Sequence, residues 1–295
     1  MKIITTHGGA FHADDIFAVA TLILVLKEEY TIVRTRDEAL FADSDYLIDV
    51  GGVLDPSKGR FDHHQQGGAG ERKNGIPYAS FGLLWNTYGL ELCGGNAEAM
   101  ERIDNLLVVG IDAIDNGVEI FTNLHKGVYP YTIGNFFQSF HPSGNATIED
   151  NDRTFINCVN LAKDLLAREI LNAIEQVTLQ QKVIEIYQKA GDKRVLVLDG
   201  RYPWGDVVQR FPEPLFVVYP DRNHGERWSA KAVRVDPMSF TPRKKYPESW
   251  AGKSNEEFRD VSGVSDAVFC HRDRFLVVAK SREGAVKLAE IAANA

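Results

Sequence analysis

The chain has 295 residues, of which 44% are hydrophobic and 25% are charged, so it has enough apolar residues for one large or two ordinary globular domains. Its formal net charge of −8 argues against a broad basic surface for duplex DNA, although bound metal ions would add positive charge where a phosphate has to lie. Three isolated cysteines, Cys93, Cys158 and Cys270, exclude a disulfide framework. These cysteines fit a reducing compartment, and no apolar leader or membrane-spanning run is found, so we expect a cytoplasmic protein.

The first half of the chain alternates predicted strands with predicted helices. In chain order these are a strand at Lys2–Thr6, a helix from Asp14 or Asp15 to about Glu29, strands at Thr31–Thr35 and Tyr46–Val50, two short extended pieces around a turn at Pro56–Gly59, and helices at Ser80–Tyr88 and about Ala97–Val109. This alternation predicts a parallel sheet with flanking helices, in which ligands bind beyond the carboxyl ends of the strands. We therefore expect the side chains that follow the strands to meet at one edge of the sheet.

The second half begins with a long helical segment that we interpret as a linker. From Asn151 to Lys189 the pattern is almost uninterrupted helix, either two helices or one bent helix. Beyond it we predict strands at Val195–Leu198, Leu215–Tyr219, Trp228–Arg234, Ala267–Cys270 and Phe275–Ala279, and a closing helix at Glu283–Ala293. The predicted fold is thus α/β. A catalytic domain with a parallel sheet covers residues 1–190, with residues 151–190 as its helical linker, and a smaller α+β domain covers residues 191–295.

Histidines and carboxylates gather at the predicted strand ends and loops. They are His7, His12, Asp14, Asp49, Asp62, His63, His64 and Asp115. Carboxylates alone would repel one another, whereas carboxylates mixed with imidazoles suit Mn²⁺ or another borderline divalent ion. Carboxylates also bridge metal ions, so the set could hold two of them, the arrangement that hydrolyses phosphate esters. A structural zinc site would instead favour thiolates and four closed ligands.

Each of these residues also has an ordinary structural explanation when it is taken alone. His7 could be a polar residue at a strand end, Asp49 could belong to a turn, and Asp115 precedes a common turn signal. Asp15 we assign to the helix start, where a carboxylate caps free amides, and we leave Asp14 for the metal. Together, however, three histidines and three carboxylates at predicted strand ends and loops predict a metal site.

Several motifs along the chain resemble those of a known family. They are Thr6–Asp15, Asp49–Pro56, Arg60–Gln65, Ser80–Trp85 and Asp112–Val118 in the first half, and Tyr219–Asp221, Arg227-Trp228, Pro247–Gly252, Phe269–His271 and Arg282–Ala285 in the second. In this order they resemble the melanocyte-proliferating-gene (Myg) family of metal-dependent hydrolases. That family is a branch of the DHH phosphoesterase superfamily, which is named for the Asp-His-His triplet. The resemblance covers essentially the whole chain.

The resemblance implies a two-domain enzyme with two metal ions, usually manganese, in the cleft between its domains. One ion would be held by His7, His12 and Asp49, and the other by Asp14, Asp49, His63 and Asp115, with Asp49 bridging the two. His64 would remain free to touch the phosphate, and Asp62 would orient His63 from the second layer of residues. Asp49, His64 and Asp62 are therefore the catalytic candidates.

The resemblance also implies a 3′-to-5′ exonuclease that acts on single-stranded RNA or short oligonucleotides and releases nucleoside 5′-monophosphates. Candidates for substrate contacts are His64, Arg234, His271 and the basic run Arg243, Lys244 and Lys245, which lies in a predicted loop. The alternatives are a small-molecule phosphoesterase or inorganic pyrophosphatase with the same metal set, and a non-catalytic protein that keeps metal for structure. No membrane partner is expected, and a homo-oligomer remains open. His125 and His141 lie in no motif, and we treat both as structural or surface residues.

Overall fold

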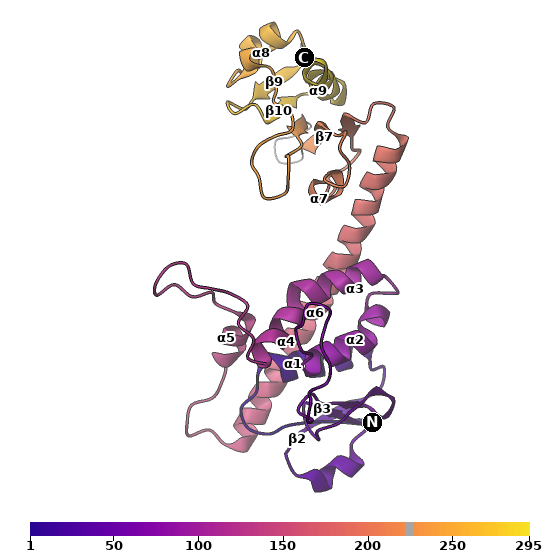
Figure 1. Ribbon diagram of the computed structural model, residues 1–295, viewed down its shortest axis with the longest axis vertical. Coiled ribbons are helices and arrows are strands. Elements are labelled where there is room, and N and C mark those ends of the chain that lie inside the picture. Colours follow the sequence, from indigo (N-terminus) through magenta and orange to yellow (C-terminus); the bar gives the residue numbers. More distant parts are fainter. Residues whose placement is uncertain (222–226) are drawn as a thin grey trace. The chain divides into compact units, whose positions relative to one another are not determined.

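The computed structural model describes residues 1–221 and 227–295. The chain divides into two compact units, Met1–Ile174 and Glu175–Ala295, and each unit has its own five-stranded mixed sheet (Figure 1). The long helix α6, Ile148–Lys189, contributes residues to both units. The division into units falls inside this helix, whereas the expected domain boundary near residue 190 falls at its end. No helix of the described ranges is both long enough and apolar enough to cross a membrane.

The sheet of the first unit has the strand order β2-β1-β3-β5-β4. Its strands are β1 (Lys2–Thr6), β2 (Tyr30–Arg34), β3 (Tyr46–Ile48), β4 (Leu54–Asp55) and β5 (Arg60–Phe61). The pairs β1–β2, β1–β3 and β3–β5 are parallel, but β4 runs antiparallel to β5. The prediction of a purely parallel sheet was therefore wrong at this edge. The reason is a short turn around Gly59, since only antiparallel strands can be joined by so tight a connection.

Two core helices cover this sheet. Helix α1 (Ala13–Val25) is buried from its start to Ile23, and it packs against α2 (Ser80–Leu92). The Phe17 and Phe81 rings stack between these helices with their centroids 5.1 Å apart. Because α1 is buried on all sides, it is a core helix, and the Asp14 and Asp15 carboxylates of its first turn are buried with it.

The predicted helix at Ala97–Val109 is not one regular helix. Helix α3 (Ala97–Ile103) passes into a π-helical turn at Asp104–Val108 and then into α4 (Val109–Asp115). The turn places the Asp104 carboxylate against the guanidinium of Arg72, at 2.9 and 3.1 Å. Such turns occur frequently at functional sites, and here α4 carries a predicted metal ligand at its end. A short helix, α5 (Ile133–Gln138), follows, which the sequence pattern did not indicate.

Helix α6 is a single helix of 42 residues, so the alternative of two helices was wrong. It contains no Pro or Gly that would interrupt its backbone hydrogen bonds. In the first unit its buried side chains follow the helical period, namely Phe155, Cys158, Val159, Ala162, Leu166, Ile170 and Ala173. This one apolar stripe fixes the helix to the first unit.

The second unit is α+β, as the sequence predicted. Its sheet has the order β6-β7-β8-β10-β9, with strands β6 (Val195–Val197), β7 (Phe216–Asp221), β8 (Arg227–Ala232), β9 (Ala267–Cys270) and β10 (Leu276–Ala279). Only β6 and β7 pair in parallel, and the other pairs are antiparallel. The helices are α7 (Gly205–Val208), α8 (Asn255–Ser262) and α9 (Arg282–Asn294). Helix α9 buries five apolar side chains in the core of this unit, Ala285, Leu288, Ala289, Ala292 and Ala293.

Candidate metal centre

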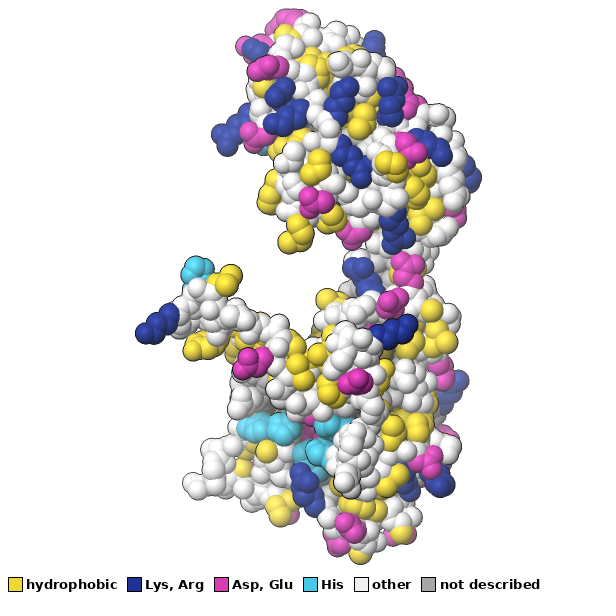
Figure 2. Space-filling model, viewed as in Figure 1, with side chains coloured by type: hydrophobic (Ala, Val, Ile, Leu, Met, Phe, Trp, Pro, Cys, Tyr) yellow, Lys and Arg dark blue, Asp and Glu magenta, His cyan; other side chains and the backbone are white. Residues whose placement is uncertain are grey.

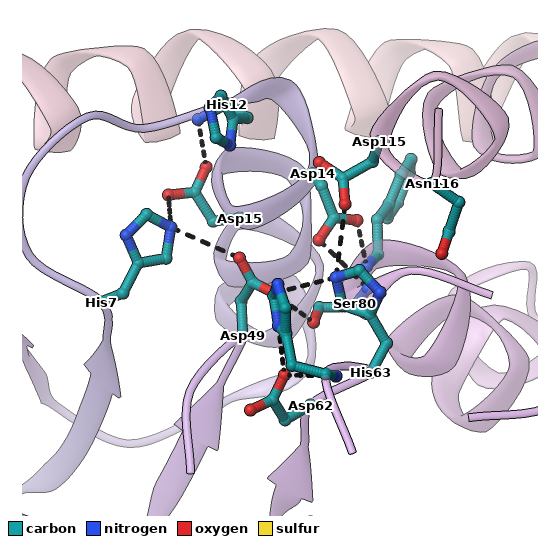
Figure 3. Close-up of polar contacts among 12 residues, drawn as sticks. His7, His12, Asp14, Asp15, Asp49, Asp62, His63, Ser80, Asp115 and Asn116 are labelled. Atoms are coloured by element: carbon teal, nitrogen blue, oxygen red, sulfur yellow. Dashed lines mark hydrogen bonds and ion pairs between the residues drawn. The ribbon is translucent and has the colours of Figure 1, made fainter. Parts of the chain in front are cut away.

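The predicted strand-end residues meet at one edge of the first sheet. His7 follows β1, Asp49 follows β3, and Asp62, His63 and His64 follow β5. Since these three strands are adjacent and parallel, their carboxyl ends lie together, as the sequence pattern indicated. Figure 3 shows His7, Asp49 and His63 near Asp14 and Asp15 at the start of α1, and in Figure 2 histidine and acidic side chains gather on this face of the unit.

Asp49 lies at the centre of the group. Its Oδ2 is 3.3 Å from Nε2 of His7, and its Oδ1 is 3.2 Å from Nε2 of His63. Oδ1 also accepts a hydrogen bond from the Ser80 hydroxyl at 3.1 Å. The carboxylate is buried, and each of its oxygens faces a different imidazole. This is the position that a bridging carboxylate between two cations requires.

Two groups of side chains have ligand atoms close enough to hold a cation. They are Asp49, His63 and His64, and Asp14, His63 and Asp115. The His63 ring belongs to both, and its Nε2 lies 3.3 Å from Oδ2 of Asp115. This nitrogen is buried and has no hydrogen-bond partner among the described residues. A nitrogen that lies close to two carboxylates without a hydrogen bond to either fits a divalent ion, which would bind it and offset the acidic charge.

The buried charges shift the pKa values of the two central imidazoles upward. Burial lowers the pKa of His7, but the carboxylates of Asp15 and Asp49 outweigh it and raise the pKa to about 10. Burial likewise opposes the protonated form of His63, yet Asp115 and Asp49 raise its pKa to about 11. In the metal-free protein these rings therefore carry protons in the positions where cations would otherwise lie.

The carboxylates respond to the same environment in opposite ways. Burial raises the pKa of Asp49, but the contacts with His63 and His7 overcome it and hold the pKa below its ordinary value. For Asp14, burial and the nearby charges of Asp49 and Asp115 all raise the pKa well above its ordinary value. Asp14 is thus a carboxylate that a cation would stabilise in its charged form. Its oxygens accept hydrogen bonds from the backbone amides of Ser80 and Phe81, at 3.1 and 2.7 Å.

Asp62 does not orient the histidine that we expected. Its Oδ1 accepts hydrogen bonds from the backbone amide and from Nδ1 of His64, the latter at 2.8 Å, while its Oδ2 accepts from the Gly52 amide at 2.6 Å. The prediction that it supports His63 was therefore wrong, because the chain turns between Asp62 and His64 and brings these two side chains together. The His64 side chain is 62% exposed and presents its outer edge to solvent.

Two residues at this site were not predicted to belong to it. Asp15 caps α1 by accepting from the amides of His12 and Ile16, as expected, but its other oxygen lies 3.1 Å from Nε2 of His7 without a hydrogen bond. Because helix capping alone accounts for an aspartate at this position, the sequence offered no reason to expect the contact between Asp15 and His7. Nothing in the sequence indicates a role for Ser80 beyond its place in a motif that resembles the family.

The predicted metal ligand His12 lies apart from the other ligands. Its side chain is exposed, its ring centroid lies 6.3 Å from that of His7, and it belongs to neither cation-holding group.

The substrate candidates of the second unit divide into two sets. Arg234 and Lys245 line a pocket of about 610 Å³ together with Lys231, and the Arg234 guanidinium lies 4.8 Å from the centre of the Phe240 ring. His271 packs against Phe275, which also lines this pocket, with ring centroids 4.3 Å apart. These residues come together as a cationic and aromatic surface.

Arg243 and Lys244 have other contacts. The Arg243 guanidinium donates to the carbonyls of Phe211 and Pro214 at 2.7 and 3.1 Å, and the Lys244 ammonium donates to the carbonyl of Ala293 at 3.1 Å. Backbone carbonyls thus hold two of the three cations of this basic run. Only Lys245 of the run lines the pocket.

Comparisons with known proteins give one consistent result. The family model MYG1_exonuc, described as an uncharacterised protein family (UPF0160), matches residues 3–293. The chain is 29% identical to the MYG1 protein C694.04c of Schizosaccharomyces pombe, over 97% of this chain and 95% of the relative. It is 28% identical to the MYG1 exonuclease of Homo sapiens, over 97% of this chain and 84% of the relative, and 28% identical to a MYG1 protein of Chlamydia pneumoniae, over 96% and 93%. No solved structure matches significantly.

Proposed function

Because the chain belongs to the MYG1 exonuclease family (UPF0160), we propose that it is a metal-dependent phosphodiesterase, and specifically a 3′-to-5′ exonuclease on single-stranded RNA or short oligonucleotides. The observation that carries this proposal is the position of Asp49 between the His7 and His63 rings. His63 in turn faces Asp14 and Asp115, so the donor set can be shared between two cations, for which Mn²⁺ is our first choice.

We propose two ligand sets that share Asp49, as the resemblance implies, although the two groups described above share His63. His63, Asp14 and Asp115 would hold one ion with one oxygen of Asp49, and His7, with His12 as the resemblance implies, would hold the other ion with the second oxygen. When bound, two divalent ions supply positive charge that offsets the charge developing on the phosphate oxygens during hydrolysis.

Other residues of the chain position the substrate and the ligands. Asp62 fixes the ring of the exposed His64, whose outer nitrogen can contact a phosphate oxygen. Ser80 and the first amides of α2 hold the Asp49 and Asp14 carboxylates in place, so the charges do not have to reorganise when a phosphate arrives.

The second unit offers a surface suited to a single strand. Lys231, Arg234 and Lys245 provide positive charge in a chain that is negative as a whole, and Phe240 and Phe275 provide ring faces. Cations that follow the backbone and rings that stack on bases are the usual means of binding single-stranded nucleic acid without strong sequence preference. The cations alone could also bind pyrophosphate, but the ring faces of Phe240 and Phe275 would be of little use to an enzyme that acts on it.

One panel of substrates with Mn²⁺ tests this function. It contains end-labelled single-stranded RNA, the same sequence as DNA, a dinucleotide, and inorganic pyrophosphate. We expect a ladder of RNA products that shortens from the 3′ end, with release of nucleoside 5′-monophosphates. Rapid hydrolysis of pyrophosphate with intact RNA would refute the exonuclease and favour a small-molecule phosphoesterase.

A further inference from the structure

A pocket of about 520 Å³ lies beside the metal centre in the first unit, and none of the roles above uses it. Its lining includes Asp14 and Asp115, which together with His63 form one of the two cation-holding groups. A ligand in this pocket would therefore lie directly next to a bound ion. The volume is in the range of pockets that hold small organic molecules.

The lining combines apolar and amide side chains. Phe11, Ile111, Ile114 and Ile133 provide apolar surface, and Ile114 is 43% exposed in the free protein. Helix α5 adds the side-chain amides of Asn135 and Gln138, and the Oδ1 of Asn135 already accepts hydrogen bonds from Thr132. Within the described residues, the Gln138 amide forms no hydrogen bond. Apolar faces joined to a few amides are typical of a site that takes a flat, polar-edged ring.

This pocket is held in its shape by His141. The Nε2 of His141 donates a hydrogen bond to the Phe11 carbonyl at 2.9 Å, and its ring lies 4.2 Å from the Phe11 ring between centroids. These contacts fasten the segment after α5 to the loop that carries His7 and His12. His141, which we expected to be a structural or surface residue, is thus a positioning residue of this wall.

We propose that this pocket binds the nucleobase of the 3′-terminal nucleotide while the phosphate of that nucleotide lies at the metal centre. The inference rests on the proposed exonuclease function and deepens it. A base offers two apolar faces to the isoleucines, and donors and acceptors on its edge to the amides of α5. A substrate without a base, such as pyrophosphate, cannot use this surface.

A pair of glycine substitutions tests the pocket. Gly134 lines it, and a Cβ at this position would come no closer than 3.5 Å to the hydroxyl of Thr132, which is an ordinary contact. Gly134→Leu therefore places a side chain in the pocket without backbone strain. Gly144→Leu is the matched control, because a Cβ there meets no atom within 4 Å and Gly144 does not line the pocket.

The substrates are an RNA oligonucleotide and the same oligonucleotide with an abasic 3′-terminal residue. We expect the wild type and Gly144→Leu to show a kcat/KM about tenfold higher for the intact end, the factor that contacts to one base usually provide. Gly134→Leu should lose this preference. Binding gives a second readout by calorimetry in Mn²⁺, in which the wild type should bind adenosine 5′-monophosphate more tightly than ribose 5-phosphate and Gly134→Leu should bind both equally.

The outcomes separate this inference from the proposed function. If the wild type degrades RNA but treats intact and abasic ends alike, the pocket does not bind a base and the exonuclease stands. If the wild type releases no nucleotide from RNA, the proposed exonuclease function is refuted. Equal binding of adenosine 5′-monophosphate and ribose 5-phosphate would then reject the nucleobase pocket as well. Should Gly134→Leu not fold, Gln138→Ala replaces it, with a reduced preference for the intact end as the expected result.

Discussion

The backbone of Asp49 is strained, with a φ of 56° that few residues other than glycine adopt. Such a conformation costs about 1–3 kcal/mol and persists only where the surrounding structure enforces it. Gly51 and Gly52, which also have positive φ values, follow after Val50 and allow the chain to turn away. The turn aims the Asp49 carboxylate between two imidazoles, so the strain serves the geometry of the site.

The substitution Asp49→Asn keeps the size of this side chain and removes its charge. We expect the hydrolysis rate at saturating Mn²⁺ to fall at least about a hundredfold, the loss that follows removal of one electrostatic stabiliser at a reacting centre. Calorimetry should show weaker Mn²⁺ binding as well. Asp43→Asn, at an exposed carboxylate of the same unit, is the control. Near-wild-type turnover of Asp49→Asn would contradict the bridging role.

Metal binding should release protons from the two central histidines. Their pKa values of about 10 and about 11 lie above the ordinary value of 6.5, so both rings are protonated at pH 8 in the metal-free protein. A ligand nitrogen must lose its proton to bind a metal ion. We expect about two protons to be released as Mn²⁺ saturates the protein at pH 8, measured from the binding heat in two buffers of different ionisation enthalpy.

The raised pKa values of His7 and His63 also determine how the stability of the fold and the Mn²⁺ affinity change with pH. Because the folded pKa values are raised, these histidines stabilise the metal-free fold fully below about pH 6.5, and that stabilisation is lost as the pH rises toward 10 and 11. The apparent Mn²⁺ affinity should change in the opposite direction and increase with pH over this range. Added Mn²⁺ should therefore partly restore activity at low pH. A binding heat that is the same in both buffers would contradict this account.

At the scale of elements, the position of α4 depends on a buried ion-pair network beside α2. Arg72 donates to Asp112 at 2.6 Å, and the other oxygen of Asp112 accepts from the amide of Gly82 at 3.0 Å. A Cβ on Gly82 would overlap the Asp112 carboxylate. Glycine is therefore required here for the close approach of α2 to α4, which brings Asp115 to the candidate metal centre.

The substitution Gly82→Ala should destabilise the protein by at least about 1–3 kcal/mol, the cost of overpacking a core, because Asp112 is fixed and cannot give way. Gly110→Ala is the matched helical control. Its Cβ would lie 4.0 Å from the nearest side-chain atom, so removal of a helical glycine should stabilise the protein by about 0.5–1 kcal/mol. Urea unfolding followed by circular dichroism measures both. Equal free energies of unfolding for the two variants would contradict the packing argument.

For the whole molecule, the cations of the second unit should serve strand binding and leave metal binding unchanged. Lys245→Ala removes a cation from the pocket, whereas Lys244→Ala removes one that a backbone carbonyl holds. We expect Lys245→Ala to weaken binding of a labelled single-stranded RNA. The slope of log K for RNA binding against the logarithm of the salt concentration should become shallower by about 0.7, the value for one lost phosphate contact.

Lys244→Ala should bind the RNA as the wild type does, and both variants should bind Mn²⁺ with unchanged affinity. Fluorescence anisotropy over a range of salt concentrations, with a chelator to prevent hydrolysis, gives the RNA affinities. A larger loss from Lys244→Ala than from Lys245→Ala would show that the strand does not follow this pocket.

The sequence by itself determined which residues end the strands of the first sheet, and therefore the strand-end residues of the candidate metal centre. Alternating strands and helices predict parallel neighbours, and His7, Asp49 and His63 follow three such strands directly. These features are local, since a residue's place at the end of a strand depends on the pattern of the few residues before it. The two-unit α/β order was predictable for the same reason.

Only the tertiary structure decided which atoms of these residues meet. The Asp15 carboxylate lies against His7, Asp62 accepts a hydrogen bond from His64, and the Arg243 guanidinium donates to backbone carbonyls. The sequence alone suggested a different role for each of these residues. The pocket beside the metal centre depends on His141, which reaches back 130 residues to Phe11. Contacts of this kind arise from the packing of distant segments, and no local pattern of residues encodes which side chain fills the space between them.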